Sequence, residues 1–195
     1  RRETKINRYN SLDDPRIDLD RLLEMMKTAF NGESPTKEYL ERLKKVTRRV
    51  YLCSRYTGFI LLTDEPGCDV PYMDKFVVSK LAQGIGTGKA LWLEVLEDCN
   101  KLFWRSRRSN QINAWYHNVS HGHYRRHGEK DWVIFYRGLH PGRDSGEIDK
   151  CKGSNPPKSC YDEWENDKKY KNESVLRAMV RKLLLEKKPG PKPKK

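Results

Sequence analysis

The chain lacks any apolar run near the roughly twenty residues that a membrane-spanning helix needs, so we expect no membrane span. It has no Cys-x-x-Cys pair, and its cysteines are odd in number. A disulfide framework is therefore not expected, and the simpler hypothesis is a set of reduced thiols. The cysteines are Cys53, Cys68, Cys99, Cys151 and Cys160.

Acidic residues are scarce relative to basic ones, because 27 Asp and Glu stand against 40 Lys and Arg and give a net charge of +13. This balance favours anionic partners: nucleic acid, an acidic membrane face, or phosphorylated and carboxylated small molecules. The basic tail at residues 187–195 has no aromatic side chains to stack on bases, so nucleic acid is the weaker hypothesis. The chain begins with Arg1, which leads us to expect a processed or excised fragment with no transit peptide visible.

Composition divides the chain into three parts. We expect an N-terminal extension at residues 1–13, one globular domain at 14–140 and a loosely structured basic extension at 141–195. Apolar spacing predicts one amphipathic helix inside the last part, at about 173–187.

The central domain alternates between helical and strand patterns. Asp14 and Pro15 are expected to open a first helix that Gly32 ends, and Ser34 with Pro35 to open a second. Further strands are expected at 50–53, 58–63, 71–78 and 132–136, with another that begins at 102–104, and further helices are expected at about 87–100 and at 110–118. This order predicts a mixed α/β fold with one sheet flanked by helices.

Glycines are concentrated between the predicted strand at 71–78 and the helix that follows it, in the sequence Gln83-Gly84-Ile85-Gly86-Thr87-Gly88. Glycines there let the backbone bend tightly and point several N–H groups at one spot, and the helix dipole adds positive potential. Such a turn favours a phosphate or pyrophosphate ligand. The alternative is a flexible glycine turn with no ligand.

The spacing of these glycines excludes two common phosphate loops. A Walker A loop requires Ser or Thr after Gly-Lys, and Ala90 follows Lys89 here; the spacing also differs from Gly-x-Gly-x-x-Gly. The remaining pattern, Gln-x-x-Gly-x-Gly, resembles the acetyl-CoA pyrophosphate loop of the GNAT acetyltransferases. The resemblance assigns cofactor binding to Val77, Val78, Gln83, Gly84, Ile85, Gly86, Thr87, Gly88 and Lys89.

Two arginines two residues apart end the predicted strand at 102. Arg105 and Arg107 share one face of a strand, where a dicarboxylate could be clamped bidentately. Solvated arginines at a surface strand end are the alternative.

Five motifs in a fixed order extend the resemblance: Asp-Lys-Phe-Val-Val, Gln-Gly-x-Gly-x-Gly, Leu-Phe-Trp-Arg-Ser-Arg, Asn-x-Ile-Asn-x-Trp-Tyr and Trp-x-Ile-Phe-Tyr-x-Gly. Over about residues 35–139 they resemble the acetyltransferase domain of vertebrate-type N-acetylglutamate synthases. That resemblance implies a GNAT-type mixed sheet and transfer of acetyl from acetyl-CoA to the α-amino group of L-glutamate. It also implies a role in arginine biosynthesis or the urea cycle, and a location in the mitochondrial matrix.

The resemblance also implies roles for single residues. Lys75 would contact the glutamate, and Arg105 with Arg107 would hold its carboxylates. Asn110 and Tyr116 match positions proposed to act in catalysis, Asn110 to orient the amine and Tyr116 to protonate the departing thiolate. Backbone N–H groups near Val77 and Val78 could stabilise the oxyanion. The substrate-binding set is Lys75, Arg105, Ser106, Arg107 and Asn110.

The chain departs from the family in several places. Gln111 and Ala114 replace two prolines, so we expect a less rigid turn before Tyr116. A further substrate lysine has only Lys37 as a weak match. The family's amino-acid-kinase-like domain is expected to be missing from these 195 residues, and a homo-oligomer is a further hypothesis. The insert with His117, His121, His123 and His127 is expected to be a polar loop, with no metal site.

Three functional alternatives follow: a non-catalytic GNAT-like regulatory or binding module, a GNAT enzyme with another small amine as acceptor, and a nucleic-acid-binding fragment. The glycines at 84, 86 and 88 argue against the module, because a purely structural copy has no need for them where a phosphate would lie.

Overall fold

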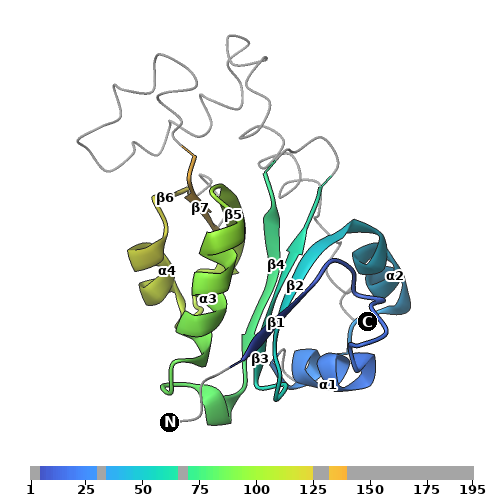
Figure 1. Cartoon of the computed structure of the whole chain (residues 1–195). Coiled ribbons are helices and arrows are strands. Elements are labelled where there is room, and N and C mark those ends of the chain that lie inside the picture. The colour runs from blue at the N-terminus through green and yellow to red at the C-terminus, as the bar shows by residue number, and fades with distance from the viewer. Residues whose placement is uncertain (1–4, 30–33, 66–69, 125–131, 140–195) are drawn as a thin grey trace, which may run out of the picture. The chain divides into compact units, whose positions relative to one another are not determined.

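The computed structural model describes residues 5–29, 34–65, 70–124 and 132–139. Its strands form a mixed sheet in the order β1-β2-β3-β4-β5-β7-β6, with helices beside it (Figure 1). The predicted fold class, a mixed α/β sheet flanked by helices, is confirmed. The elements are β1 Ile6–Tyr9, α1 Leu19–Ala29, α2 Lys37–Val46, β2 Thr47–Cys53, β3 Gly58–Thr63, β4 Tyr72–Val78, the 3-10 turn η1 Lys80–Ala82, α3 Thr87–Asp98, β5 Leu102–Arg107, α4 Asn113–Val119, β6 Gly122–Tyr124 and β7 Trp132–Arg137.

The chain forms two compact units, and the boundary between them falls inside β5. The first unit contains every element up to α3 together with Leu102–Trp104. The second begins at Arg105 and contains the end of β5, α4, β6 and β7.

The first unit is built around four antiparallel strands, β1 to β4, with α1 and α2 between β1 and β2. All residues of β3 are buried, as expected for a central strand with apolar groups on both faces. Side chains of α1 and α2, among them Leu22 and Leu43, share one core cluster with Leu52, Phe59 and Val77 of the strands. Helix α3 packs on β2 and β3 from the other side of the sheet (Figure 1).

The N-terminal boundary predicted from the sequence is wrong. Residues assigned to an extension form β1, which pairs with β2 from Ile6 opposite Cys53 to Tyr9 opposite Val50. Leu12 is also fully buried. A strand of four residues carries too little periodicity to be recognised locally, and its stabilising contacts come from residues far along the chain.

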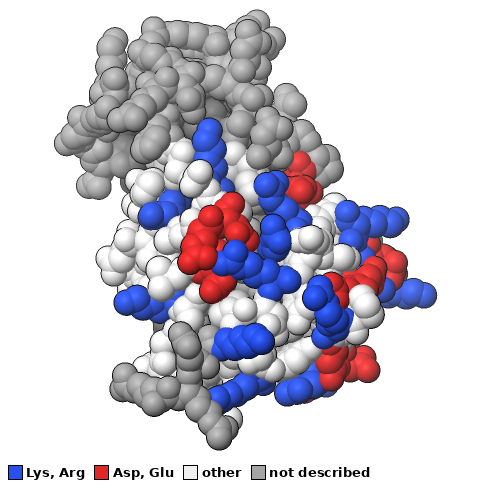
Figure 2. Space-filling model, viewed as in Figure 1, with Lys and Arg blue, Asp and Glu red and all other residues white. Residues whose placement is uncertain are grey.

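Ion pairs attach this strand to α3. The Arg8 guanidinium lies 2.6 Å from a Glu94 oxygen and 3.0 Å from an Asp98 oxygen. Figure 2 shows the acidic side chains gathered over α3 and bordered by basic ones. These pairs join β1 to a helix more than eighty residues away.

Both predicted helix starts lie too early. Helix α1 begins at Leu19, and the Asp18 carboxylate accepts a hydrogen bond of 3.1 Å from the Arg21 N–H. Asp14, the predicted cap, instead accepts from the backbone and guanidinium of Arg16. Helix α2 is capped by Thr36, whose hydroxyl accepts from the Tyr39 N–H at 3.2 Å. In both helices, the N-terminus is capped by a residue that follows the predicted one: Asp18 in place of Asp14, and Thr36 in place of Ser34.

In the second unit, β6 pairs with β7 from Gly122 opposite Tyr136 to Tyr124 opposite Ile134. The predicted short helix and last strand are present as α4 and β7, whereas β6 was not predicted. The expected end of the first helix at Gly32, the basic extension at 141–195 and its helix at about 173–187 lie outside the described residues. In the part of the chain that the structure describes, no helix has the length and apolar character to span a bilayer.

Candidate functional site

The glycine turn, defined here as Gln83–Lys89, connects β4 and η1 to the first turn of α3, as predicted. Gly84 and Gly86 have φ of +78° and +93°, in the left-handed region that glycine adopts without strain. Gly86 is also the residue before the first turn of α3. The opening N–H groups of a helix have no intrahelical partner, so this turn presents donors and the positive end of a dipole.

Packing does not require a glycine at position 88. A Cβ at this position would lie 3.5 Å from the nearest side-chain atoms, those of Phe76 and Val78, which is ordinary van der Waals contact. The protein itself would therefore accept alanine at 88. A glycine at a position where the fold does not need one fits a backbone that a ligand must approach closely. The residues present thus fit a phosphate-bearing group.

Two hydrogen bonds to backbone carbonyls fix the junction between β4 and the turn. The Gln83 side-chain amide donates to the Val78 carbonyl at 3.3 Å. The Ser79 N–H donates to the Thr57 carbonyl of the β3 side at 2.9 Å. Because N–H directions alternate along a strand, the Val77 N–H faces β3 and the Val78 N–H faces the opposite edge of β4. Of the two predicted oxyanion donors, Val78 is the one directed away from the antiparallel ladder.

Lys75 lies at a β-bulge. Leu61 is opposite Lys75 and Leu62 is opposite Met73, so Asp74 is the extra residue of β4. Bulges redirect side chains, and this one brings two consecutive side chains into one contact. The Lys75 ammonium is 2.6 Å from the Asp74 carboxylate.

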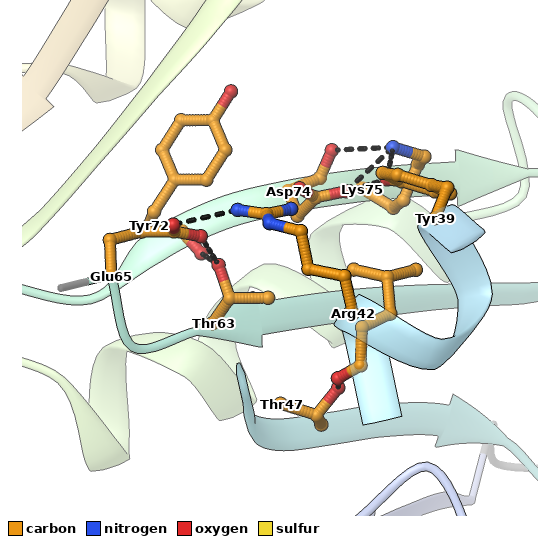
Figure 3. Close-up of polar contacts among 9 residues, drawn as sticks. Tyr39, Arg42, Thr47, Thr63, Glu65, Tyr72, Asp74 and Lys75 are labelled. Carbon is orange, nitrogen blue, oxygen red and sulfur yellow. Dashed lines mark hydrogen bonds and ion pairs between the residues drawn. The ribbon is translucent and has the colours of Figure 1, made fainter. Parts of the chain in front are cut away.

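Tyr39 of α2 completes this cluster. Its hydroxyl donates to the Asp74 carboxylate and accepts from the Lys75 ammonium (Figure 3). Burial, followed by the negative charge of Asp74, raises the pKa of Tyr39 above its usual range, so the phenol stays protonated. The Asp74 carboxylate thus supplies a counter-charge to the Lys75 ammonium from within the protein.

A second ion pair lies next to this cluster. Arg42, one turn after Tyr39 on α2, binds the buried Glu65 carboxylate at 2.7 Å, and the Thr63 hydroxyl donates to the same carboxylate at 2.7 Å (Figure 3). The sequence analysis missed Tyr39, Arg42 and Glu65. The i, i+3 spacing of Tyr39 and Arg42, which puts both on one face of the helix, is the pattern that could have found them.

The arginine segment, defined here as Arg105–Tyr116, belongs to the second unit. Arg105 and Arg107 lie on the same face of β5, as predicted, and their guanidinium carbons are 4.4 Å and 4.8 Å from the ring centre of Trp132. Ser106 points to the other face and is buried. Trp132 was not predicted to belong to the site.

Asparagine side chains fix the turn that follows β5. The Asn110 amide donates to the Ser106 hydroxyl at 3.1 Å, and its carbonyl oxygen accepts from the Ile112 N–H at 3.4 Å. The Asn113 amide donates to the carbonyls of Arg107 and Arg108 at 2.7 Å and 3.2 Å. These bonds restrain the turn where the family's prolines are replaced by Gln111 and Ala114. The proposed catalytic role of Asn110 stays a prediction.

Tyr116 is buried in α4, with its ring centre 5.7 Å from that of Trp115 and 5.4 Å from that of Phe135. Burial raises the pKa of the Tyr116 hydroxyl above its usual range. The group therefore remains a neutral proton donor throughout the physiological range of pH.

The histidine insert is only partly described. The rings of His117 and His123 meet edge to face with centres 4.5 Å apart, and His117 also packs on Phe135. His121 accepts from the Gly138 N–H, and His127 lies outside the described residues. Within the described ranges, no group of three or more His, Cys, Asp or Glu is placed to hold a metal ion.

Comparison of the sequence with known proteins identifies the family of this chain. The family model described as the N-acetyltransferase of N-acetylglutamate synthase matches residues 5–152. The mitochondrial N-acetylglutamate synthase of Danio rerio is 39% identical over 156 residues, which are 80% of this chain and 28% of that protein. An acetylglutamate kinase of Xylella fastidiosa is 38% identical over 124 residues, 64% of this chain and 28% of that protein. The chain thus spans little more than a quarter of the length of either relative.

Structural comparison supports the same assignment at the level of the fold. The N-acetylglutamate synthase of Neisseria gonorrhoeae, solved with coenzyme A and N-acetyl-glutamate, superposes with a TM-score of 0.50 at 17% identity. The match covers 71% of this chain and 36% of that one. At this identity the likeness concerns the fold alone. Because the family model matches most of the chain, from the first strand to beyond the last, the chain belongs to the family of the N-acetyltransferase domain of N-acetylglutamate synthase.

Proposed function

We propose that this chain transfers the acetyl group of acetyl-CoA to the α-amino group of L-glutamate. The observation that carries the proposal is the family match over residues 5–152, which includes both the glycine turn and the arginine segment. The zebrafish relative is named a synthase of N-acetylglutamate, and the gonococcal structure holds coenzyme A and N-acetyl-glutamate. Both names agree with the ligand classes expected from the residues.

The glycine turn would hold the pyrophosphate of acetyl-CoA through backbone N–H groups between Gly84 and Lys89. These donors need no side chain, and the N-terminus of α3 supplies a favourable potential for an anion. The Val78 N–H is our candidate donor to the oxyanion, because it points away from the antiparallel ladder while Val77 is turned toward β3.

Arg105 and Arg107 would bind a carboxylate of the acceptor, because the N–H groups of a guanidinium match the two oxygens of a carboxylate. Lys75 would contribute as part of its cluster with Asp74 and Tyr39. A carboxylate near Lys75 would meet an ammonium already partnered by Asp74, so this contact would direct the substrate more than it would attract it. Asn110 would orient the amine.

The chemistry requires one bond to form and one to break. The neutral amine attacks the thioester carbonyl, the C–N bond forms, and the oxyanion collapses with cleavage of the C–S bond. Tyr116 would give its proton to the departing thiolate, and the proton released by the amine would restore the phenol by way of solvent. The raised pKa of Tyr116 keeps this acid protonated at the start of each turnover.

Transfer of isotope-labelled acetyl to a panel of amino acids tests this proposal. We expect product with glutamate and much less with aspartate or glutamine. Equal rates with these three would contradict glutamate as the acceptor, and transfer to a different amine in the panel would identify a GNAT enzyme with another acceptor.

The second candidate is a non-catalytic module. The relative from Xylella fastidiosa is named an acetylglutamate kinase, and its similar segment covers 64% of this chain. Acetyl-CoA that binds the folded state raises the melting temperature by mass action. A melting temperature that does not respond to acetyl-CoA, together with no labelled product, would favour the module.

Cellular location and assembly belong to the same proposal. The zebrafish relative is named mitochondrial, so we propose the mitochondrial matrix for this chain, which fractionation of its source cells would check. A homo-oligomer and an adjoining amino-acid-kinase-like domain, which the sequence resemblance implies, would be tested by light scattering and by sequencing the full transcript.

A further inference from the structure

Trp132 is the first residue of β7, the strand next to β5 in the sheet order. The guanidinium carbons of Arg105 and Arg107 lie 4.4 Å and 4.8 Å from the centre of its ring. Both distances are within the range over which an aromatic face attracts a cation. The Trp132 indole therefore contacts two arginines that lie on the same face of β5.

Two positive charges held at one ring repel each other. The negative potential of the indole offsets part of this repulsion, and an anion bound by both guanidinium groups would offset more. Arg107 is exposed and Arg105 half-buried, so an anion in solution can reach the two side chains. The backbone beneath them is restrained as well, because the Asn113 amide holds the Arg107 carbonyl.

We propose that Trp132 is a positioning residue that holds Arg105 and Arg107 together for one carboxylate of the amino-acid acceptor. This inference rests on the proposed function, in which the two arginines bind that acceptor. Arginine side chains have many rotamers, and restricting them before binding reduces the entropy lost when the carboxylate arrives. Without the indole, the guanidinium groups would separate and the acceptor would bind less tightly.

Two substitutions test the role of the ring. Trp132→Leu keeps apolar volume without a π face, and Trp132→Phe keeps a smaller π face. We expect Trp132→Leu to raise the KM for glutamate roughly tenfold with little change in kcat or in the KM for acetyl-CoA, and Trp132→Phe to recover most of the loss.

Acceptor analogues separate positioning from a structural effect. Glutamine lacks the side-chain carboxylate and glutamic acid α-amide lacks the α-carboxylate. The KM ratio between Trp132→Leu and wild type should fall to near one for whichever analogue lacks the carboxylate that the arginines hold. An equal rise for glutamate and both amides, or a raised KM for acetyl-CoA, would show a structural role and overturn the inference.

A matched control exists in the first unit, where the Arg21 guanidinium lies 4.3 Å from the ring centre of Tyr56. Tyr56→Leu removes an arginine–aromatic contact of the same kind and should leave both KM values unchanged. A folded Trp132→Leu variant with the wild-type KM for glutamate would also refute the inference.

Calorimetric titration with glutamate keeps the inference separate from the proposed function. If the wild type binds glutamate without transferring acetyl, the proposed function fails, and tenfold weaker binding by Trp132→Leu would still support positioning by Trp132. Equal binding by the two proteins, or binding by neither, would refute it.

Discussion

The glycine turn and the arginine segment solve the same problem, anion recognition, with different parts of the chain. The glycine turn offers backbone N–H groups, and its side chains matter mainly by being absent, as at Gly84 and Gly86 with their positive φ. The arginine segment offers charged side chains, which other side chains must hold in position. The Trp132 ring contacts the guanidinium groups of Arg105 and Arg107, and the Asn113 amide donates to the Arg107 carbonyl.

This difference teaches where each region is vulnerable. Adding a side chain at Gly88 should impair binding while sparing the fold, whereas one at Gly84 or Gly86 would also strain the left-handed backbone. Removing a supporting side chain of the arginine segment, such as that of Asn113, should impair both, because functional and supporting groups there are neighbours. Substitutions in each region can confirm or break this contrast.

The largest expected effect follows loss of the Tyr116 hydroxyl. Tyr116→Phe keeps the ring against Phe135 and removes the proposed acid, so kcat should fall about 10² to 10³-fold with the KM values nearly unchanged. Tyr136→Phe, in β7 of the same unit, makes the same chemical change and should keep wild-type turnover. A near-normal kcat for Tyr116→Phe would remove this residue from the mechanism.

The pH profile checks the same residue independently. Burial raises the pKa of Tyr116, and the protonated form is the proposed active form. Activity limited by this group should therefore persist as pH rises through about 10, the usual range for tyrosine, and fall only above it. A decline below that range would assign the titration to another group.

The next largest effect concerns the arginines. Arg105→Gln or Arg107→Gln should raise the KM for glutamate about 10 to 100-fold, because each removes a charged partner of a carboxylate. Arg108→Gln is the matched control, since Arg108 contributes its carbonyl to the Asn113 contact and its side chain is exposed. Steady-state kinetics with a normal KM for acetyl-CoA would confirm that the change concerns the acceptor; an equal effect of Arg108→Gln would point to general charge.

A smaller effect is expected at Gly88, where stability and binding should change in opposite directions. Alanine has room there, and replacing a helical glycine can stabilise by up to about 1 kcal/mol, yet the added methyl would meet a bound pyrophosphate. We expect an equal or higher melting temperature and a roughly tenfold higher KM for acetyl-CoA, a loss typical of one displaced close contact. An unchanged KM would mean that the phosphate lies elsewhere.

Gly58→Ala is the informative counterpart. Its Cβ would lie 3.0 Å from both the Leu91 side chain and the Val77 carbonyl, so here the glycine permits close packing of β3. Overpacking of this kind costs about 1–3 kcal/mol, measurable as a lower denaturation midpoint.

Local patterns predicted the parts of the fold whose causes are local. The β4–turn–α3 unit could be found because a strand, glycines and a helix start are adjacent in the sequence, and the alternation of Arg105 and Arg107 because a strand has a period of two. The edge strand at Ile6–Tyr9 could not be found, since it depends on pairing with β2 and on ion pairs between Arg8 and α3.

The candidate site shows the same limit. Lys75 could be selected by its motif, but its pairing with Asp74 arises from a β-bulge, and the residue types in this strand do not predict that bulge. Tyr39 reaches the cluster from another helix, and Trp132 reaches the arginines from another strand. Contacts that a sheet or a bulge creates between distant residues need the structure.

The smallest effect is expected from the support of the turn before α4. Asn113→Ala removes two hydrogen bonds to the carbonyls of Arg107 and Arg108, which should cost about 1–2 kcal/mol of unfolding free energy. The KM for glutamate should rise a few-fold, because the backbone that carries Arg107 is freed while its side chain is unchanged. Asn118→Ala, on an exposed position of the same helix, controls for the loss of an amide. If Asn113→Ala lowers stability without affecting glutamate, the turn supports the fold alone, and the preorganisation of the arginine segment comes from Trp132.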